Sequence, residues 1–456
     1  MAGNLTIQEL KMAAEAGEID TVLVCCVDMQ GRLMGKRFHV TNFLESSHEE
    51  THCCNYMLAT DLEMATPDGY ATTSWQAGYG DYVMKPDLST MRRVPWLEGT
   101  ALVLCDLLDH HTHEPVPQSP RQILKVQRAR LKELGYDAMM ATELEFFLFE
   151  PNRDDTQPFQ PPVGLDGRRE AGYGAFSVST SSGLRPFFDE LTDTMAALGI
   201  PRDTFMHEMG VSQYEINFVH GDPLLIADQT FLFKHALHEV AFKHGLIAVC
   251  MAKPLARVPG CSMHIHQSVV EQGSGNNIFT DAATGEATAH FGHFIGGLQQ
   301  CMGELTLLMA PYINSYQRFC HAYASPNNLC WSYDNRSAGL RIPASGPEAR
   351  RVENRLPGAD ANPYLSVAAS LAAGLYGIDN QCEPSAPAQG EFEAPDELTL
   401  PGTLHDAILR LDRSTLAREL FGAEFVDGFL ASKRMELQSF MDEITPWERR
   451  FLGSQV

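Results

Sequence analysis

The stretch Met140-Ala-Thr-Glu-Leu-Glu-Phe-Phe-Leu-Phe-Glu150 is strongly apolar, yet it carries two carboxylates, Glu143 and Glu145. Its composition predicts a β-strand, in which successive side chains point to opposite faces of the sheet. Glu143 and Glu145 then share one face, while Leu144 lies on the other. Carboxylates this close raise each other's pKa unless a cation lies between them. The stretch therefore indicates a metal site or a shared proton, with a solvated strand face as the alternative.

Functional groups are paired in the same way in three other segments. The pairs are His264 and His266, Glu353 and Arg355, and Glu208 and Glu215. The first two pairs have the spacing of one strand face, and the third brackets a short turn that can bring both carboxylates together. Carboxylates with one or two imidazoles suit Mg²⁺ or Mn²⁺, whereas zinc favours Cys and His. The four segments together predict a site for two or more divalent ions, although a single pair could equally be structural.

Arginines gather near these groups in the last third of the chain. They are Arg318, Arg336 and Arg341, and a cluster of Arg350, Arg351 and Arg355 around Glu353. Guanidinium groups beside divalent ions hold phosphates and carboxylates during phosphoryl transfer, and surface salt bridges are the alternative. The segment Gly31-Arg-Leu-Met-Gly-Lys-Arg37 lacks the spacing of a phosphate-binding loop, so we expect a turn between strands there.

Composition limits the possible partners and compartment. The chain has 456 residues, enough for two or three domains, and its net charge of -24 argues against a nucleic-acid or anionic-membrane surface. Its eleven cysteines show no CxxC spacing, which indicates reduced thiols. Neither a secretion signal nor an apolar run of about 18 residues is present, so we expect a cytoplasmic protein.

Local patterns predict two domains that meet near residue 115. A capping box opens a helix over residues 6–17, short apolar strands cover 21–27 and 101–105, and residues 60–99 read as irregular. Ser119 and Pro120 open a helix that Gly135 ends. Further helices are expected over 228–245, 291–308, 363–377 and much of 403–442, with a surface loop over 383–402.

At these residues the sequence resembles the glutamine synthetase family over nearly its whole length. The matching motifs are Glu143-Leu-Glu-Phe-Phe-Leu-Phe, residues 208–217, Met251-Ala-Lys-Pro254, Met263-His-Ile-His-Gln-Ser268, and residues 335–343 and 350–365. The resemblance implies an α+β fold: a β-grasp domain over 1–115, then a catalytic domain over 116–456. A curved antiparallel sheet would line a funnel open to ATP at one end and to glutamate at the other. It also implies a homo-oligomer, a dodecamer of two stacked six-membered rings.

The resemblance assigns roles residue by residue. One metal ion would bind Glu145, Glu208 and Glu215, and the other Glu143, His264 and Glu353. The nucleotide would meet His266, Ser268 and Arg351, the transferring phosphates Arg336 and Arg341, and glutamate Arg318, Arg355 and the backbone of Gly260. In this family ATP phosphorylates the γ-carboxylate of glutamate, and an amine then attacks the acyl phosphate to give an amide.

Three departures from the family pattern concern the amine. Glutamine synthetases carry a glutamate in a mobile flap, but the flap here reads Phe319-Cys-His-Ala-Tyr-Ala-Ser-Pro326 and places Ala324 at that position. The Asp-Gly-Ser-Ser turn of the first domain is missing, with Asp61 or Glu63 near its place, and Asn-Gly-Ser-Gly is replaced by Pro259-Gly-Cys-Ser. These departures resemble the γ-glutamyl-amine ligase branch. An ordinary glutamine synthetase and a catalytically silent scaffold or regulator are the alternatives.

Replacing a carboxylate by the methyl group of Ala324 removes a negative charge and opens space for a substituent on the amine. Deprotonation of the amine would then fall to Asp61, Glu63 or the phosphate itself, and would be unnecessary for an aromatic amine. The neighbours Cys53, Cys54, Tyr56, Cys320 and Tyr323 favour a small, weakly polar substituent over a long polyamine.

Overall fold

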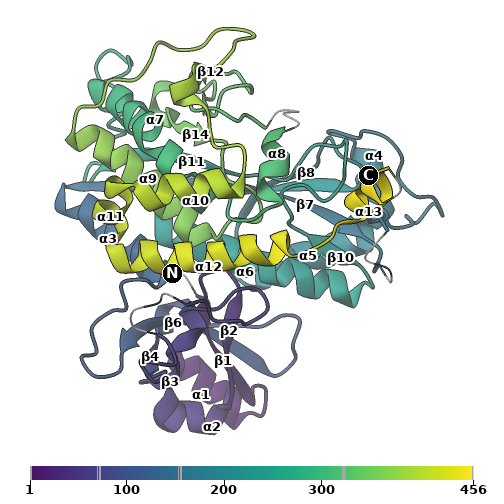
Figure 1. Cartoon of the computed structure of the whole chain (residues 1–456). Coiled ribbons are helices and arrows are strands. Elements are labelled where there is room, and N and C mark those ends of the chain that lie inside the picture. The colour runs from purple at the N-terminus through teal and green to yellow at the C-terminus, as the bar shows by residue number, and fades with distance from the viewer. Residues whose placement is uncertain are drawn as a thin grey trace.

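The protein is built on two β-sheets with most of its helices packed on the larger one (Figure 1). The computed structural model describes residues 3–68, 70, 73–152, 154, 157–320, 325–453 and 455–456. The two flap positions singled out above, Tyr323 and Ala324, lie outside these described residues. Within the described residues, no helix is long and apolar enough to cross a membrane, and all eleven cysteines are free.

The smaller sheet lies in the first part of the chain, and its strand β1 is buried on both faces. Its six strands run in the order β2-β1-β6-β4-β3, with β5 on β6, and only the pair β1–β6 is parallel. Val22 and Val24 face a core beneath the first helix, whereas Leu23 and Cys25 join the core of the larger part. Burial on both faces explains why β1 is an uninterrupted apolar run. The strands are β1 (Thr21–Val27), β2 (Leu33–His39), β3 (Thr51–Cys54), β4 (Asp81–Pro86), β5 (Arg92–Arg93) and β6 (Thr100–Asp109).

The prediction that residues 60–99 are irregular is wrong for β4 and β5. β4 pairs with β3 on one side and β6 on the other, although it contains Asp81, Lys85 and Pro86. These residues hide the strand pattern, because charges and proline are depleted in strands. The turn expected over 31–37 is also shorter than predicted: Gly31 belongs to a turn, and Leu33 begins β2.

The larger sheet has eight strands in the order β12-β13-β14-β11-β7-β9-β8, with β10 on β7. Every pair is antiparallel except β12–β13. As predicted, the stretch from Met140 is a strand: it forms the end of β7, which lies near the middle of this order. The strands are β7 (Tyr136–Phe149), β8 (Arg202–His207), β9 (Gln213–Phe218), β10 (Ile247–Val249), β11 (Met263–Glu271), β12 (Trp331–Tyr333), β13 (Leu340–Ile342) and β14 (Val352–Asn354).

Helices cover the apolar face of this sheet and leave its polar face free. α3 and α6 pack on β7, α9 packs on β11, and α7 lies along α9 (Figure 1). The predicted helices are confirmed, including the Thr6–Glu9 capping box. The helices are α1 (Ile7–Glu15), α2 (Val40–Asn42), α3 (Pro120–Glu133), α4 (Val178–Ser181), α5 (Arg185–Ala197), α6 (Pro223–Lys243), α7 (Ala289–Met309), α8 (Ser315–Cys320), α9 (Pro363–Asp379), α10 (Leu404–Arg413), α11 (Thr415–Phe421), α12 (Ala423–Met441) and α13 (Pro446–Leu452).

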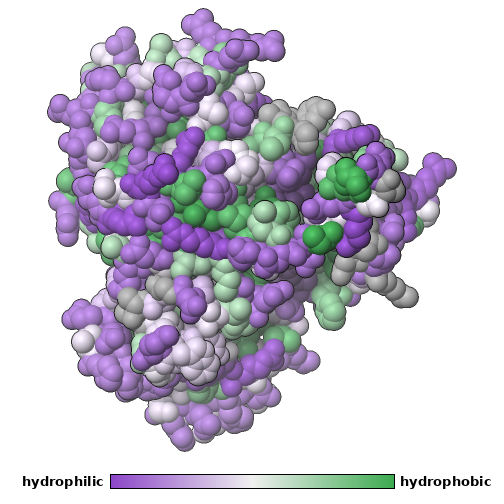
Figure 2. All heavy atoms as spheres, viewed as in Figure 1, coloured by the Kyte–Doolittle hydropathy of each residue, from purple (hydrophilic) through white to green (hydrophobic). Residues whose placement is uncertain are grey.

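A buried ionic cluster joins the two parts of the chain. Arg121, in the first turn of α3, lies 2.8 Å from Asp87 and 2.7 Å from Asp106 of the small sheet region, and 3.0 Å from Asp228 of α6. The predicted boundary near 115 falls between the end of β6 and the start of α3, and stays a prediction. α12 runs between the two parts, and hydrophilic residues cover most of the face seen in Figure 2.

Candidate active site

The register of the large sheet gathers the predicted metal ligands on one face. Glu145 lies directly opposite Glu215 on β9, and Glu143 lies opposite His264 on β11. One strand further along, His266 lies opposite Glu353 on β14. Residues two apart on a strand share a face, so these cross-strand pairs line up across β9, β7, β11 and β14.

Glu143 is the centre of the first cluster. Its carboxylate lies 2.7 Å from His266 Nε2 and 3.3 Å from His264 Nδ1, and His264 Nδ1 lies 3.6 Å from Glu353. Burial alone would raise the pKa of Glu143, but the hydrogen bonds to the two histidines outweigh it and hold that pKa well below its usual value.

Glu353 completes this cluster as a fully buried carboxylate. Arg341 Nη1 donates to it at 2.6 Å, and Arg355 donates to its other oxygen. Burial would raise the pKa of Glu353, but the adjacent charges of His264 and Arg355 hold it at about 2. Glu353 is therefore ionised at neutral pH, as a metal ligand must be.

The donor atoms of this cluster fit a hard divalent cation. Ligand atoms of Glu143, His266 and Glu353 all lie within 4.8 Å of one another. His264 Nε2 is buried and has no hydrogen-bond partner among the described residues. Carboxylate oxygens with a limited number of imidazoles suit Mg²⁺ or Mn²⁺. This group of three contains His266, whereas the prediction made His264 a metal ligand and placed His266 beside the nucleotide.

Three carboxylates form a second cluster beside the first. Glu145 accepts hydrogen bonds from Gln213 Nε2 at 2.8 Å and from the Ser262 N–H at 3.1 Å. Burial, followed by the charge of Glu208, raises the pKa of Glu145 to about 8. Burial and the charges of Glu143, Glu145 and Glu208 raise the pKa of Glu215 to about 9. A bound cation would relieve this repulsion. Among the described residues, however, it is the first cluster that gathers three ligand atoms within 4.8 Å of one another.

Two cavities meet at the shared wall of these clusters. The inner cavity, about 350 Å³, is lined by Glu143 and His264 of the first cluster and by all three carboxylates of the second. Gly260, Arg336, Arg341 and Arg355 also line it. The outer cavity, about 720 Å³, is lined by His266, Ser268 and Arg351 among others. Glu143 and Asn217 line both cavities. Most residues predicted for glutamate and phosphates therefore lie on the inner side, and those predicted for the nucleotide on the outer side.

Some predicted residues lie away from the inner cavity. Arg318 is buried behind its wall, where it donates to Ser262 Oγ at 2.8 Å and to the Leu356 carbonyl. Asp61 lies in the N-terminal region, where its carboxylate accepts from the N–H groups of Glu63 and Ala65, each at 2.9 Å. Within this single chain, Asp61 does not line either cavity.

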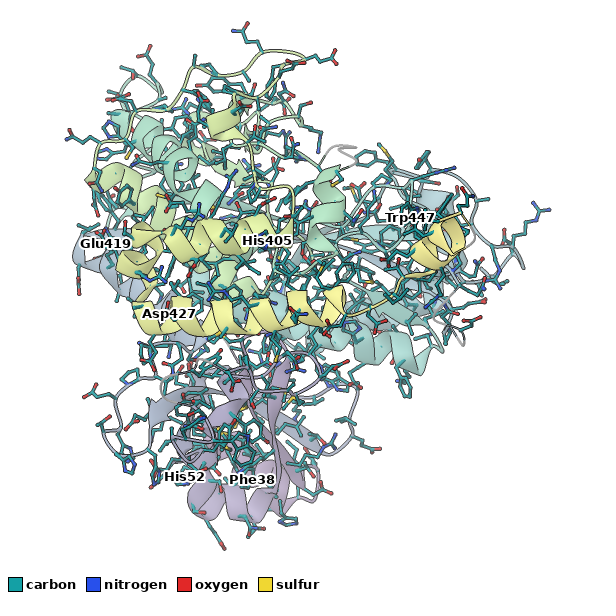
Figure 3. All side chains as sticks on the ribbon, viewed as in Figure 1. Phe38, His52, His405, Glu419, Asp427 and Trp447 are labelled. Atoms are coloured by element: carbon teal, nitrogen blue, oxygen red, sulfur yellow. The ribbon has the colours of Figure 1, made fainter. Side chains whose placement is uncertain are left out.

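The thiol-bearing neighbours expected around the amine are also elsewhere. Cys53, Cys54 and Tyr56 line a separate pocket of about 280 Å³. His52 lines the same pocket and lies in the lower, N-terminal part of the molecule in Figure 3. Cys320, at the end of α8, is exposed and does not line the inner cavity.

Sequence reasoning missed several residues of the inner cavity. Asn217 joins the two cavities, and Gln213 links Glu145 to the Gly260 carbonyl, 2.8 Å from Gln213 Nε2. Asn217 could have been predicted from the sequence, because it lies two residues after Glu215 and shares its strand face. Phe176 had none, because it belongs to a loop that long-range contacts bring to the cavity.

The family is identified by comparison with known proteins. Residues 117–452 match the glutamine synthetase catalytic domain. A gamma-glutamylethanolamide synthetase of Streptomyces coelicolor is 39% identical over 449 residues, which cover 98% of this chain and 95% of that protein. A glutamate–isopropylamine ligase of a Pseudomonas species is 34% identical over 443 residues, which cover 95% of each chain.

Solved structures agree with this result over the full length. The structure of GmaS without ligand superposes with a TM-score of 0.83 at 28% identity, covering 98% of this chain and 99% of that one. A GmaS complex with ADP gives a TM-score of 0.83 at 27% identity, covering 97% and 98%. The predicted α+β fold and its family resemblance are thereby confirmed. The chain belongs to the glutamine synthetase family of ATP-dependent carbon–nitrogen ligases.

Proposed function

We propose that this protein joins the γ-carboxylate of L-glutamate to a primary organic amine at the expense of ATP. The reaction would pass through γ-glutamyl phosphate and give a γ-glutamyl amide, ADP and phosphate. The observation that carries the proposal is the meeting of two cavities at Glu143 and Asn217. A nucleotide in the outer cavity and glutamate in the inner one would bring their reacting groups together at that wall.

The residues of the outer cavity suit a nucleotide. His266, Ser268 and Arg351 lie on its wall, and Arg351 Nε donates to His266 Nδ1 at 3.1 Å, which orients the imidazole. A guanidinium at this position can also meet a phosphate oxygen. The triphosphate would then point along β11 toward Glu143.

The residues of the inner cavity would hold glutamate and offset charge during phosphoryl transfer. Arg336 and Arg341 line the inner cavity, where they would neutralise the moving phosphoryl group. Arg355 and the backbone of Gly260 would hold glutamate, and Arg318 would support this wall from behind. When bound, Mg²⁺ or Mn²⁺ ions supply further positive charge at the two carboxylate clusters.

The amine completes the reaction by attacking the acyl carbon of γ-glutamyl phosphate. The nitrogen forms the amide bond, phosphate leaves with the electrons of the broken C–O bond, and the nitrogen loses a proton. No Ser or Cys nucleophile is required for this sequence. One relative is named for a γ-glutamylethanolamide product and the other for joining glutamate to isopropylamine, and both names support an organic amine as the acceptor.

The test is ADP release with glutamate, ATP and a panel of amines. We expect at least one primary organic amine among ethanolamine, isopropylamine, methylamine, aniline and putrescine to be used about tenfold better than ammonium, because pockets commonly discriminate to that degree. Mass spectrometry should find the γ-glutamyl amide. Efficient glutamine formation with no gain from any amine would indicate an ordinary synthetase. No ADP release under any condition would indicate a silent scaffold or regulator.

We further propose a dodecamer of two six-membered rings, in which a neighbouring subunit would bring Asp61 or Glu63 to the inner cavity. The position of Asp61 outside both cavities of its own chain supports a shared site. Light scattering at assay concentration should give the mass of twelve chains. A fully active monomer would contradict this proposal.

A further inference from the structure

Phe176 lies on the wall of the inner cavity, which four glutamates and three arginines also line. Its side chain is 72% exposed, and its φ of 62° places it in the left-handed region. Bulky residues adopt that conformation rarely, at a cost of about 1–3 kcal/mol, and they keep it only where the surroundings impose it. Strained backbone positions cluster at binding and active sites, so a strained aromatic residue at a cavity is a candidate for a functional role.

His207 is the residue that imposes this conformation from one side. It ends β8, its imidazole is buried, and its carbonyl accepts from the Phe176 N–H at 2.8 Å. His207 Nε2 lies 3.0 Å from the Glu170 carboxylate, and Nδ1 lies 2.6 Å from the Glu208 carbonyl. A Cβ on Gly174 would come within 2.8 Å of the His207 ring, so only glycine fits there.

Tyr173 holds the same loop, residues 170–177, from the opposite side. Its hydroxyl donates to the Arg257 carbonyl at 3.1 Å. Arg257 precedes Pro259 and Gly260, which both line the inner cavity. The 170–177 loop is therefore attached to two separate segments of the cavity wall, and these attachments fix the backbone that carries Phe176.

Phe176 shares the inner cavity with two other large apolar residues, Met206 and Met209. Met206, on β8, lies directly opposite Glu215 of β9. The hydrogen bond from the Phe176 N–H to the His207 carbonyl puts Phe176 beside the residue that precedes Glu208. None of these three side chains can hold a metal ion or glutamate by charge, but together they can bury a hydrocarbon group.

We propose that Phe176 determines amine specificity by contacting the organic substituent of the acceptor, and that the Glu170–His207 pair positions it. The substrate class is a primary amine with a small apolar or aromatic substituent. A polyamine is disfavoured, since its second charge would meet the methionines. This inference rests on the proposed amine-ligase function and names the acceptor's chemistry.

The first test compares Phe176→Ala with the unchanged enzyme on methylamine, isopropylamine, benzylamine and ethanolamine. For the best amine with an apolar substituent, kcat/KM should fall about tenfold or more, mainly through a higher KM for the amine. The KM values for glutamate and ATP should change less than twofold. The control is Val178→Ala, because Val178 is exposed on the same segment and does not line the inner cavity.

The second test addresses the positioning pair. Glu170→Ala should produce the same selectivity change as Phe176→Ala, and Glu170→Gln, which can still accept from His207, should restore the original selectivity. A change in thermal stability without a change in selectivity would show that the pair is only structural.

Different results would overturn the specificity role of Phe176 and the amine-ligase function. If the unchanged enzyme uses organic amines but Phe176→Ala keeps the same ratios between them, the specificity role is overturned and the ligase function stands. If the unchanged enzyme uses no organic amine, both are overturned.

Discussion

Glu143→Gln is expected to lower ADP release by roughly 10²- to 10³-fold, the loss typical of removing one preorganised electrostatic group from an active site. Its carboxylate lies on the wall shared by the two cavities and contacts both His264 and His266. A glutamine keeps the shape but loses the charge, and its NH₂ group would face one of the imidazoles. The affinity for Mn²⁺, measured by calorimetry, should fall together with turnover.

A matched substitution on the same sheet controls for the loss of one negative charge. Glu271 ends β11, is exposed, and accepts a hydrogen bond from Ser274 Oγ at 2.9 Å. Glu271→Gln should keep the turnover and Mn²⁺ affinity of the unchanged enzyme. Retention of more than a tenth of the turnover by Glu143→Gln, with unchanged Mn²⁺ affinity, would refute its assignment as a metal ligand.

Much of the catalytic sheet could be predicted because its signals are local. Two carboxylates in an apolar strand, as at Glu143 and Glu145, have to share a face whatever the strand pairs with. The capping box of α1 is equally local. The His264 and His266 spacing placed both imidazoles on one face for the same reason, and the register then put that face beside Glu143.

The remaining features depend on contacts that no local pattern encodes. β4 is a strand because β3 and β6 pair with it on both sides, which offsets the low strand propensity of Lys85 and Pro86. The sequence spacing treats His264 and His266 alike, so it could not tell which imidazole gathers with Glu143 and Glu353. Phe176 reaches the inner cavity through hydrogen bonds with a strand some thirty residues away along the chain.

Glu215→Gln is expected to abolish most of the activity and yet to stabilise the cation-free protein at pH 8. In the unfolded chain this carboxyl titrates near its usual pKa of 4.5, whereas in the folded protein burial and three neighbouring carboxylates raise its pKa to about 9. Folding therefore takes up a proton between these values. Its contribution to stability is fully present below pH 4.5 and is lost as the pH rises toward 9.

An amide cannot ionise, so Glu215→Gln removes the loss of folding stability that ionisation of Glu215 causes as the pH rises. Without divalent ions, the free energy of unfolding at pH 8 should exceed that of the unchanged protein by up to about 5 kcal/mol, since each pH unit between 4.5 and 8 corresponds to about 1.4 kcal/mol. At pH 4.5 the difference should nearly vanish. Denaturant unfolding at both pH values measures it.

Saturating Mn²⁺ should reverse the order of the two proteins at pH 8, because a bound cation stabilises the ionised carboxylates and binds the variant more weakly. The same carboxylate that destabilises the empty site would then stabilise the loaded one. An equal gain in stability from Mn²⁺ in both proteins would show that Glu215 is not a ligand. If Glu215 is a ligand, the burial and repulsion that raise the pKa values of Glu145 and Glu215 are the cost of a site built to be filled by a cation.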